Sequence, residues 1–266
     1  MDGKPIIVVK IGGSIAGNPA EIARDIAQLN ERFVIVHGGG PQVSALERAT
    51  GREPRYIYSK DGFKSRHTDE GTMANFEMAV GGGVNSMLVR ALRKAGLQAV
   101  GVSGASGIVM AKRKTLVSVE NGKEKIIRDD YSGKIREISA PPLNALLNAG
   151  FVPVVAPIAL GEEFEALNVD GDRAAAAISS RLGASRLILF TDVEGFYSDF
   201  PNGLVSAAKQ ADIAGFQKKA SAGMKRKLVA ADEALSGGVA EVIICSGLQK
   251  RPVSAALAGG GTHFTK

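Results

Sequence analysis

Two glycine-rich turns, each directly after a short apolar run, carry the clearest chemical signal in the sequence. The first contains Lys10, Gly12 and Gly13, and the second is HGGGP at residues 37–41. Glycine lets the backbone come close to a ligand, and the N–H groups at the start of a helix favour anions. One such turn is equally typical of an ordinary strand-to-helix connection. Two such turns at adjacent strand ends, one of them beside a lysine, indicate a site that binds phosphate groups.

Other familiar phosphate and hydrolase motifs do not occur in the sequence. It has no GxxxxGK[ST] loop and no GxSxG motif, and Gly101, Gly104 and Gly107 lack the spacing of a GxGxxG fingerprint. With three histidines and one cysteine in the chain, we expect no metal held by protein side chains. We expect His37 and His67 to form local hydrogen bonds rather than to catalyse.

The elements that position these turns are short apolar strands alternating with helical patterns. Nearly continuous Val, Ile and Leu runs are typical of strands buried on both faces of a parallel sheet. The clearest runs are residues 5–11, 33–37, 98–102, 152–156, 186–191 and 241–245. The sequence therefore predicts an α/β fold with an open, mostly parallel, doubly wound sheet sandwiched by helices. In such sheets ligands bind beyond the carboxyl ends of the strands, where both glycine turns fall.

The segment 112–136 breaks this alternation. It contains two strand patterns around Glu120-Asn121-Gly122, and Asn-Gly is typical of a hairpin turn. We expect an inserted β-hairpin on the surface. A fresh strand–turn–helix series begins near Leu182, which predicts an N-terminal lobe of residues 1–182 and a C-terminal lobe of residues 183–266.

Composition and charge exclude several classes of protein. Hydrophobic residues make up 45% of the chain, and no apolar run approaches the roughly 20 residues that span a bilayer. The first residues do not resemble a signal peptide, and the single Cys245 fits a reducing compartment, so we expect a cytoplasmic protein without a membrane partner. The net charge of +6 indicates an anionic ligand or an acidic partner. The basic stretches lack interleaved aromatic residues, so we expect no nucleic acid.

Six motifs, in order along essentially the whole chain, resemble those of the amino acid kinase family. They are KIGGS (10–14), VHGGGPQV (36–43), SRHTD (65–69), NVDGDRAAAA (168–177), FTDVEGFY (190–197) and AGMKRKL (222–228). The most similar branch contains N-acetylglutamate kinase and relatives that act on carrier-bound substrates. The resemblance implies a phosphotransferase that uses ATP and Mg²⁺ to convert a carboxylate into an acyl phosphate.

The resemblance also implies a role for each matching residue. Lys10 and Lys227 match the lysines at the transferring phosphoryl group, and Asp172 matches the aspartate that orients them; Lys225 is close enough to compete with Lys227. The implied substrate contacts are Gly39, Gly40, Arg66 and Asn168, and the implied nucleotide contacts are Gly12, Gly13, Thr191, Asp192, Val193, Gly195, Tyr197 and Lys225. Taken singly, several of these residues have an ordinary structural explanation. Asp172 fits the first turn of a helix, and Asn168 fits an N-cap position. Their joint occurrence supports the assignment.

Two substrates fit the resemblance. One is α-aminoadipate or glutamate attached to the C-terminus of the small acidic carrier protein LysW, in lysine or arginine synthesis; the other is free N-acetyl-L-glutamate. An acidic carrier fits the basic segment 112–136, which we expect to dock it. The cations of that segment are Lys112, Arg113, Lys114, Lys123, Lys125, Arg128, Lys134 and Arg136. Aminoadipate and glutamate differ by one methylene, and the sequence does not indicate which of them is the substrate.

A sensor that binds nucleotide or amino acid without turnover is a third hypothesis. Such a protein has no need of the charges that act on a transition state, so the presence of Lys10, Asp172 and Lys227 argues against it. The resemblance further implies a homodimer formed across the N-terminal lobe.

Overall fold

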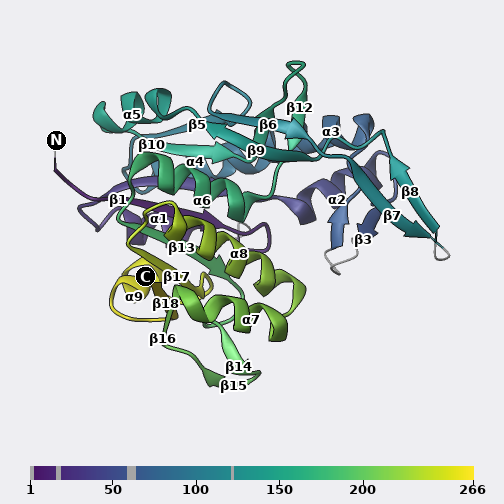
Figure 1. Ribbon diagram of the computed structural model, residues 1–266. Coiled ribbons are helices and arrows are strands. Elements are labelled where there is room, and N and C mark those ends of the chain that lie inside the picture. The colour runs from purple at the N-terminus through teal and green to yellow at the C-terminus, as the bar shows by residue number, and fades with distance from the viewer. Residues whose placement is uncertain (1–2, 16–18, 59–63, 121–122) are drawn as a thin grey trace.

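An eight-stranded sheet runs through the molecule (Figure 1), in a computed structural model that describes residues 3–15, 19–58, 64–120 and 123–266. The strand order is β16-β18-β17-β13-β1-β2-β10-β5, and every neighbouring pair is parallel except β17–β18. The strands are β1 (Ile6–Ile11), β2 (Arg32–His37), β5 (Ala99–Ser103), β10 (Val152–Ala156), β13 (Arg186–Thr191), β16 (Ala207–Lys209), β17 (Glu241–Ser246) and β18 (Thr262–Thr265). The predicted mostly parallel sheet is confirmed.

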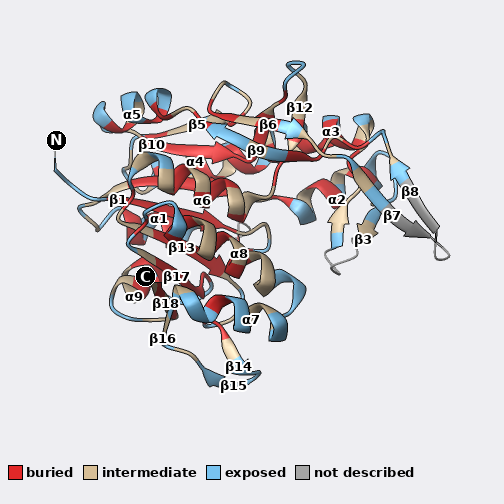
Figure 2. Ribbon diagram, in the orientation of Figure 1, coloured by how far each residue is buried: buried red, intermediate tan, exposed pale blue. Residues whose placement is uncertain are grey.

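Helices cover both faces of this sheet. Side chains alternate between the faces along each strand, so each strand packs against both helical layers. Val8 packs with one layer of helices, and its neighbours Ile7 and Val9 pack with the other. Figure 2 shows the buried strands between the two layers. The first layer is α5 (Ala140–Asn148), α6 (Gly171–Leu182), α7 (Ile213–Lys219) and α8 (Ala222–Ser236), and the second is α1 (Pro19–Ile26), α4 (Asn85–Lys94) and α9 (Pro252–Leu257).

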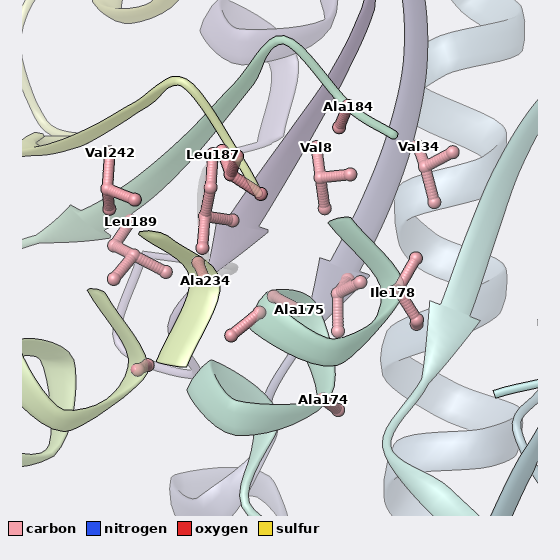
Figure 3. Packing of buried hydrophobic residues seen from close by; sticks show 14 of the residues in the cluster. Val8, Val34, Ala174, Ala175, Ile178, Ala184, Leu187, Leu189, Ala234 and Val242 are labelled. Carbon is pink, nitrogen blue, oxygen red and sulfur yellow. The ribbon is translucent and has the colours of Figure 1, made fainter. Parts of the chain in front are cut away.

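The alanines of α6 bring this helix close to the sheet (Figure 3). Ala174, Ala175 and Ile178 pack in one cluster with Val8 and Leu187 of the central strands. An alanine side chain ends at Cβ, so the helix axis can lie nearer to the strands than a row of leucines would allow. The first turn of α6 is thereby held next to the carboxyl end of β1.

A second, four-stranded sheet has the order β12-β11-β6-β9. Its strands are β6 (Val109–Arg113), β9 (Gly133–Ile138), β11 (Ile158–Leu160) and β12 (Ala166–Asn168). Two-stranded ribbons are β3 (Tyr56–Tyr58) with β4 (Lys64–Arg66), β7 (Leu116–Glu120) with β8 (Lys123–Ile127), and β14 (Tyr197–Asp199) with β15 (Asn202–Leu204). The remaining elements are α2 (Gly40–Ala49), α3 (Glu70–Phe76), the π-helix η1 (Glu77–Val84) and the 3₁₀ turn η2 (Gln210–Asp212).

The ribbon β7–β8 is the predicted hairpin, and it projects from the body of the molecule (Figure 1). Its predicted Asn121-Gly122 turn lies outside the described residues. The hairpin is shorter than the segment 112–136, because that segment begins in β6 and ends in β9, which pair with each other. Within the described part of the chain, no helix is both long and apolar enough to cross a membrane.

Candidate active site

Lys10, Asp172 and Lys227 meet at the carboxyl end of β1. The Lys10 Nζ lies 2.7 Å from Asp172 Oδ1, and the Lys227 Nζ lies 3.2 Å from both Asp172 oxygens. β1 supplies Lys10, the first turn of α6 supplies Asp172, and α8 supplies Lys227. All three residues are at most 8% exposed. The structure therefore brings together three charged residues that the sequence predicts to act together.

The start of α6 fixes the position of Asp172. Asp170 is the N-cap residue, and its Oδ1 accepts hydrogen bonds of 3.0 Å from the backbone N–H groups of Asp172 and Arg173. A Cβ at Gly171 would lie 3.4 Å from the Lys10 Cε, so the helix start packs directly on the lysine. The N-cap is thus Asp170, not Asn168.

The charges of the two lysines keep the Asp172 carboxyl ionised. Burial by itself raises the pKa of the Asp172 carboxyl, but the ammonium groups of Lys10 and Lys227 outweigh it and hold that pKa well below its usual range. Burial lowers the pKa of Lys227, Asp172 opposes that change, and the nearby charge of Lys10 adds to it. With both lysines protonated, the cluster keeps one positive charge in excess, which suits an anionic group placed between them.

The two glycine turns pack against each other beside this cluster. A Cβ at Gly13 would lie 2.7 Å from Pro41 Cδ and 3.1 Å from the Gly40 backbone nitrogen. The Gln42 side chain also donates a 3.1 Å hydrogen bond to the Gly13 carbonyl. A Cβ at Gly40 would meet no atom within 4 Å, and one at Gly12 would meet nothing nearer than 4.0 Å. Gly13 therefore joins the turns, while Gly12 and Gly40 border open space.

Gly39 connects the second turn to the helix behind it. A Cβ at Gly39 would lie 2.7 Å from Val80 Cγ2 in η1, so no larger residue fits without a shift. Gly39 precedes the first residue of α2 as its N-cap, and Pro41 lies in the first turn, where its fixed backbone angle suits a helix start.

Arg66 lies next to the second glycine turn in a fixed orientation. Its Nη1 donates to Glu47, and its Nη2 donates to the Gly40 carbonyl at 3.0 Å and to the Ser44 hydroxyl at 2.6 Å. The Tyr56 hydroxyl accepts a further bond from Nη2 at 3.3 Å. The Arg66 side chain is 9% exposed and that of Glu47 only 1%. Glu47 thus anchors the guanidinium beside the backbone of Gly40.

Asn168 is linked to Arg66 through Thr68. The Asn168 Nδ2 donates to the Thr68 hydroxyl at 3.0 Å, and that hydroxyl donates to the Arg66 carbonyl at 3.2 Å. Buried Asp130 holds the segment in place, accepting from the backbone N–H groups of Thr68 at 2.8 Å and Ser132 at 2.7 Å. This role of Asp130 could not be predicted from the sequence, because the Thr68 N–H that it binds is 62 residues away along the chain.

His37 is a buried, neutral residue beside the cluster. Burial is the main reason that its pKa falls to about 4; the hydrogen bond to Gly38 opposes this change and the Lys10 charge adds to it. The Asn85 Nδ2 donates to His37 Nε2 at 3.0 Å, so Nδ1 carries the proton and donates to the Gly38 carbonyl at 3.1 Å. His37 therefore forms local hydrogen bonds, as the sequence predicts.

The loop after β13 lies at the same edge of the sheet. Lys10 is opposite Leu189 in the β1–β13 ladder, so Thr191 lies two residues beyond it, near Gly12. The Thr191 carbonyl accepts from the Gly247 N–H at 3.0 Å. A Cβ at Gly195 would lie 2.6 Å from the Thr262 hydroxyl, which packs this loop against β18.

The other predicted nucleotide residues extend from this loop. Asp192 is exposed and accepts from the Thr191 hydroxyl at 3.2 Å, and Val193 is half-buried. The Tyr197 hydroxyl donates to Glu194 at 3.1 Å, and its ring contacts Phe200 edge-on with centroids 5.3 Å apart.

Lys225 and Lys227 lie on different sides of α8. Residues two apart on a helix do not share a face. Lys227 is the one that contacts Asp172, whereas Lys225 is half-buried in the first turn of the helix. In the described parts of the chain, no three His, Cys, Asp or Glu side chains are grouped to hold a metal ion.

The sequence matches the amino acid kinase family over residues 5–246, so this chain belongs to that family of phosphotransferases. It is 41% identical over 258 residues to the putative [LysW]-aminoadipate/[LysW]-glutamate kinase of Cenarchaeum symbiosum, covering 95% of this chain and 96% of that protein. It is 39% identical to the [LysW]-aminoadipate kinase of Deinococcus radiodurans, with 97% and 90% covered. The family expected from the motifs is confirmed.

Solved structures give the same fold. N-acetylglutamate synthase from Neisseria gonorrhoeae, complexed with coenzyme A and N-acetyl-glutamate, superposes with a TM-score of 0.82 at 25% identity. The match covers 98% of this chain, which spans 59% of that protein's length. Carbamate kinase from Giardia lamblia bound to AMP-PNP has a TM-score of 0.71 at 17% identity, with 100% of both chains covered. The second likeness concerns the fold alone.

Proposed function

We propose that this chain uses ATP to phosphorylate the side-chain carboxylate of α-aminoadipate or glutamate attached to the carrier protein LysW. The product is an acyl phosphate in lysine or arginine synthesis. The observation that carries the transfer step is the buried cluster of Lys10, Asp172 and Lys227 beside the two glycine turns. The names of the curated relatives support the choice of carrier-bound substrate.

In the transfer step, a carboxylate oxygen of the substrate attacks the γ-phosphorus of ATP, and the bond to the bridging oxygen breaks as ADP leaves. A carboxylate with an ordinary pKa of about 4 is already ionised at pH 7, so no general base is required. Negative charge spreads over the phosphoryl oxygens in the transition state. Lys10 and Lys227 would stabilise that charge, and Asp172 would keep both ammonium groups in place before the reaction begins.

Mg²⁺ would enter with ATP, bound mainly by phosphate oxygens and water, and offset the charge of the phosphates. This mode of binding fits a site whose described residues offer no cluster of three metal ligands. We propose that Gly12 and Gly13 line the phosphates. The nucleotide would further contact Thr191, Asp192, Val193, Gly195, Tyr197 and Lys225, within a C-terminal lobe of residues 183–266.

The substrate would lie on the other side of the cluster, in an N-terminal lobe of residues 1–182. We propose that Arg66 binds the free α-carboxylate of the amino acid, because a guanidinium forms strong charge-assisted hydrogen bonds with a carboxylate. Asn168 would bind the same end of the substrate, and the backbone of Gly39 and Gly40 its reacting side. The anchoring of Arg66 by Glu47 supports this role, since a pre-oriented side chain loses little entropy on binding.

The carrier would dock on the basic segment 112–136. Lys112 and Arg128 are exposed there, and the cross-strand pair Val117 and Ile126 exposes apolar surface on the projecting hairpin. Arg113 has another role: it donates to the carbonyls of Asp130 and Arg128 and stacks on Tyr131, so it holds the hairpin base. The side chains of Lys123 and Lys125 lie outside the described residues.

A homodimer would form across the N-terminal lobe. Met78 of η1 is 56% exposed, and glycines later in the same helix are exposed too. A second copy could therefore approach that helix closely. Light scattering of the purified protein tests this proposal, and a monomer at micromolar concentration would overturn it.

The substrate is tested by trapping the acyl phosphate with hydroxylamine. Three substrates are compared at matched concentration: LysW-bound aminoadipate, LysW-bound glutamate and free N-acetyl-L-glutamate. We expect hydroxamate and ADP in equal amounts, with a clear preference for a LysW-bound substrate. Equal or higher activity on free N-acetylglutamate would overturn the substrate proposed here. No hydroxamate from any of the three would favour a binding protein without turnover.

A further inference from the structure

The π-helix η1 packs against the second glycine turn. A Cβ at Gly39 would lie 2.7 Å from Val80 Cγ2 and 3.4 Å from Val84 Cγ2, and both valines belong to η1. Val80 is fully buried, and Val84 is 3% exposed. Val80 also shares a small buried cluster with Val43 of α2, the helix that follows the turn. The two valines therefore form the surface on which the Gly39 backbone rests.

The space beside Val80 limits the size of residue 39. The φ of Gly39 is −177°, which lies outside the left-handed region that favours glycine. An alanine Cβ at this position would lie 2.7 Å from Val80 Cγ2, whereas carbon atoms in contact are about 3.5 to 4.0 Å apart. The turn or the valine would have to move by roughly 1 Å to accept it.

The hydrogen bonds of η1 explain how Val80 comes to face the turn. The N–H of Asn85 reaches the Val80 carbonyl, five residues back instead of four. Residues four apart in an α-helix drift around its axis by about 40°, and the wider π turn offsets that drift. Val80, Val84 and Leu88, each four residues from the next, are consequently all buried. Such π turns are rare and often lie at functional sites.

The end of η1 is fixed to the central sheet. The Asn85 Nδ2 donates to His37 Nε2 at 3.0 Å and to the Val154 carbonyl at 2.8 Å. A Cβ at Gly101 would lie 2.0 Å from Asn85 Oδ1, so β5 also packs closely on this side chain. Because η1 is held at Asn85, Val80 cannot move away from the turn without breaking buried hydrogen bonds.

The turn that rests on Val80 borders the proposed site of phosphoryl transfer. A Cβ at Gly171, next to Asp172, would lie 3.4 Å from both the His37 carbonyl and the Lys10 Cε. The first N–H groups of a helix have no partner within it, and a Cβ at Gly40 would meet no atom within 4 Å. A shift of the turn therefore moves the backbone that would bind the reacting end of the substrate.

We propose that Val80 is a positioning residue for phosphoryl transfer, which fixes the second glycine turn relative to the buried lysines through its contact with Gly39. The inference deepens the proposed function and rests on its transfer step, not on the choice of carrier. A misplacement of about 1 Å costs about 100-fold in rate when reacting groups must be aligned. Val80 is fully buried, so it acts through the backbone of Gly39.

The experiment exchanges the sizes of the two residues in the full-length enzyme. Gly39→Ala adds the Cβ that meets Val80 Cγ2, and Val80→Ala removes that Cγ2. In the double variant the nearest remaining atoms, Val84 Cγ2 and the Cβ of residue 80, lie 3.4 and 3.6 Å from the new Cβ. The double variant therefore accepts the alanine at position 39 without displacing the turn.

The readout is kcat from hydroxylamine trapping, together with KM for ATP. We expect Gly39→Ala to lower kcat about 100-fold and Val80→Ala to lower it about fivefold, with KM for ATP within about threefold of wild type. The double variant should have a kcat at least tenfold above that of Gly39→Ala. Thermal unfolding checks that each variant folds.

The matched control is Val253→Ala in α9. Val253 is also fully buried, but it belongs to a different cluster from Val80. The control makes the same change in size and should keep kcat within twofold of wild type, even where its unfolding temperature falls as much as that of Val80→Ala. It separates positioning of the turn from a general loss of packing.

Two results overturn the role of Val80. One is a double variant no faster than Gly39→Ala, and the other is a kcat in Val80→Ala that stays within twofold of wild type or equals that of Val253→Ala. If Gly39→Ala does not fold, the comparison of Val80→Ala with Val253→Ala decides.

The wild-type enzyme tests the proposed function separately. A wild type that prefers free N-acetyl-L-glutamate overturns the LysW-bound substrate, and the variants are then compared on N-acetyl-L-glutamate. A wild type that gives no hydroxamate from any of the three substrates overturns both the proposed function and the role of Val80.

Discussion

Asp172 is the residue on which the buried lysines depend. Its carboxylate lies within 3.2 Å of both Nζ atoms, and all three side chains are nearly inaccessible to water. Removing one partner of a buried ion pair leaves an uncompensated charge, which costs about 3 to 5 kcal/mol. Here removal would leave two like charges, Lys10 and Lys227, facing each other.

We therefore expect Asp172→Asn to lower the free energy of unfolding at pH 7 by about 3 to 5 kcal/mol. The pKa of Asp172 is lower in the folded state than its unfolded value of about 4, so the carboxylate stabilises the fold above pH 4. This contribution is lost as the pH falls further, toward the folded pKa. The deficit of the variant, measured by urea unfolding, is thus largest at pH 7 and shrinks below pH 4. A deficit that grows on acidification would contradict this account.

Asp130 holds the backbone of Thr68 and Ser132 beside Arg66 and Asn168, the residues proposed to bind substrate. Asp130→Ala removes the acceptors for the backbone N–H groups of Thr68 and Ser132. We expect KM for the amino-acid substrate to rise about tenfold while KM for ATP stays within twofold, because the change lies in the network of Arg66 and Asn168. The control is Asp129→Ala, whose side chain is 71% exposed and pairs with His67 at 3.3 Å. Equal effects of the two variants on both KM values would contradict the assignment.

The residues of the site differ in how far the sequence predicts them. Lys10, Asp172 and Lys227 lie in motifs of the family, and the structure places them in contact. The sequence does not decide which of Lys225 and Lys227 faces Asp172, because the orientation of α8 depends on how the helix packs. Glu47 and Asp130 could not be predicted, because each binds groups brought near only by the folded chain.

Among the elements, α6 matters most, because its first turn carries Asp172. Asp170 caps the helix through the N–H groups of Asp172 and Arg173. We expect Asp170→Ala to cost about 1 kcal/mol of stability and to lower kcat, since Asp172 is no longer fixed. Asp170→Asn keeps a side-chain oxygen for the cap and should remain close to wild type in denaturant unfolding. A loss of kcat that is equal in both variants would assign Asp170 a role in charge, not capping.

Strand positions follow directly from local pattern. The run 186–191 coincides with β13, and 152–156 coincides with β10, because a continuous apolar run is itself the signal of a buried parallel strand. The first and last residues of the hairpin could not be predicted from local pattern. Residues at both ends of segment 112–136 pair as β6 and β9, and only the folded sheet determines that pairing. No distinct sequence pattern marks the π-helix η1.

The fold alone does not determine the activity of this protein. A structure with a TM-score of 0.82 belongs to a synthase complexed with coenzyme A, whereas the curated relatives at 38–41% identity are named kinases. The open sheet brings the ends of β1, β2 and β13 to one edge, where any of several ligands can bind. The activity depends on which side chains are placed at that edge.

The distribution of charge over the molecule predicts how the enzyme responds to salt. The proposed docking of an acidic carrier on exposed cations would be screened as ionic strength rises, because the Debye length is about 10 Å at 0.1 M and about 3 Å at 1 M. We expect KM for LysW-bound substrate to rise at least fivefold between 0.05 and 0.5 M KCl. KM for free N-acetylglutamate, measured in the same series, should change less than twofold. Equal salt dependence of both substrates would contradict docking by charge.

Turnover by Lys10→Met tests whether the two buried lysines stabilise the transfer step. Methionine keeps much of the side-chain volume and removes the ammonium group that lies 2.7 Å from Asp172. With hydroxylamine trapping, we expect kcat to fall at least 100-fold, as for loss of one preorganised charge, while ATP still binds. Lys4→Met, at an exposed position, should retain wild-type kcat. Near-normal kcat in Lys10→Met would contradict a transfer step stabilised by the two buried lysines.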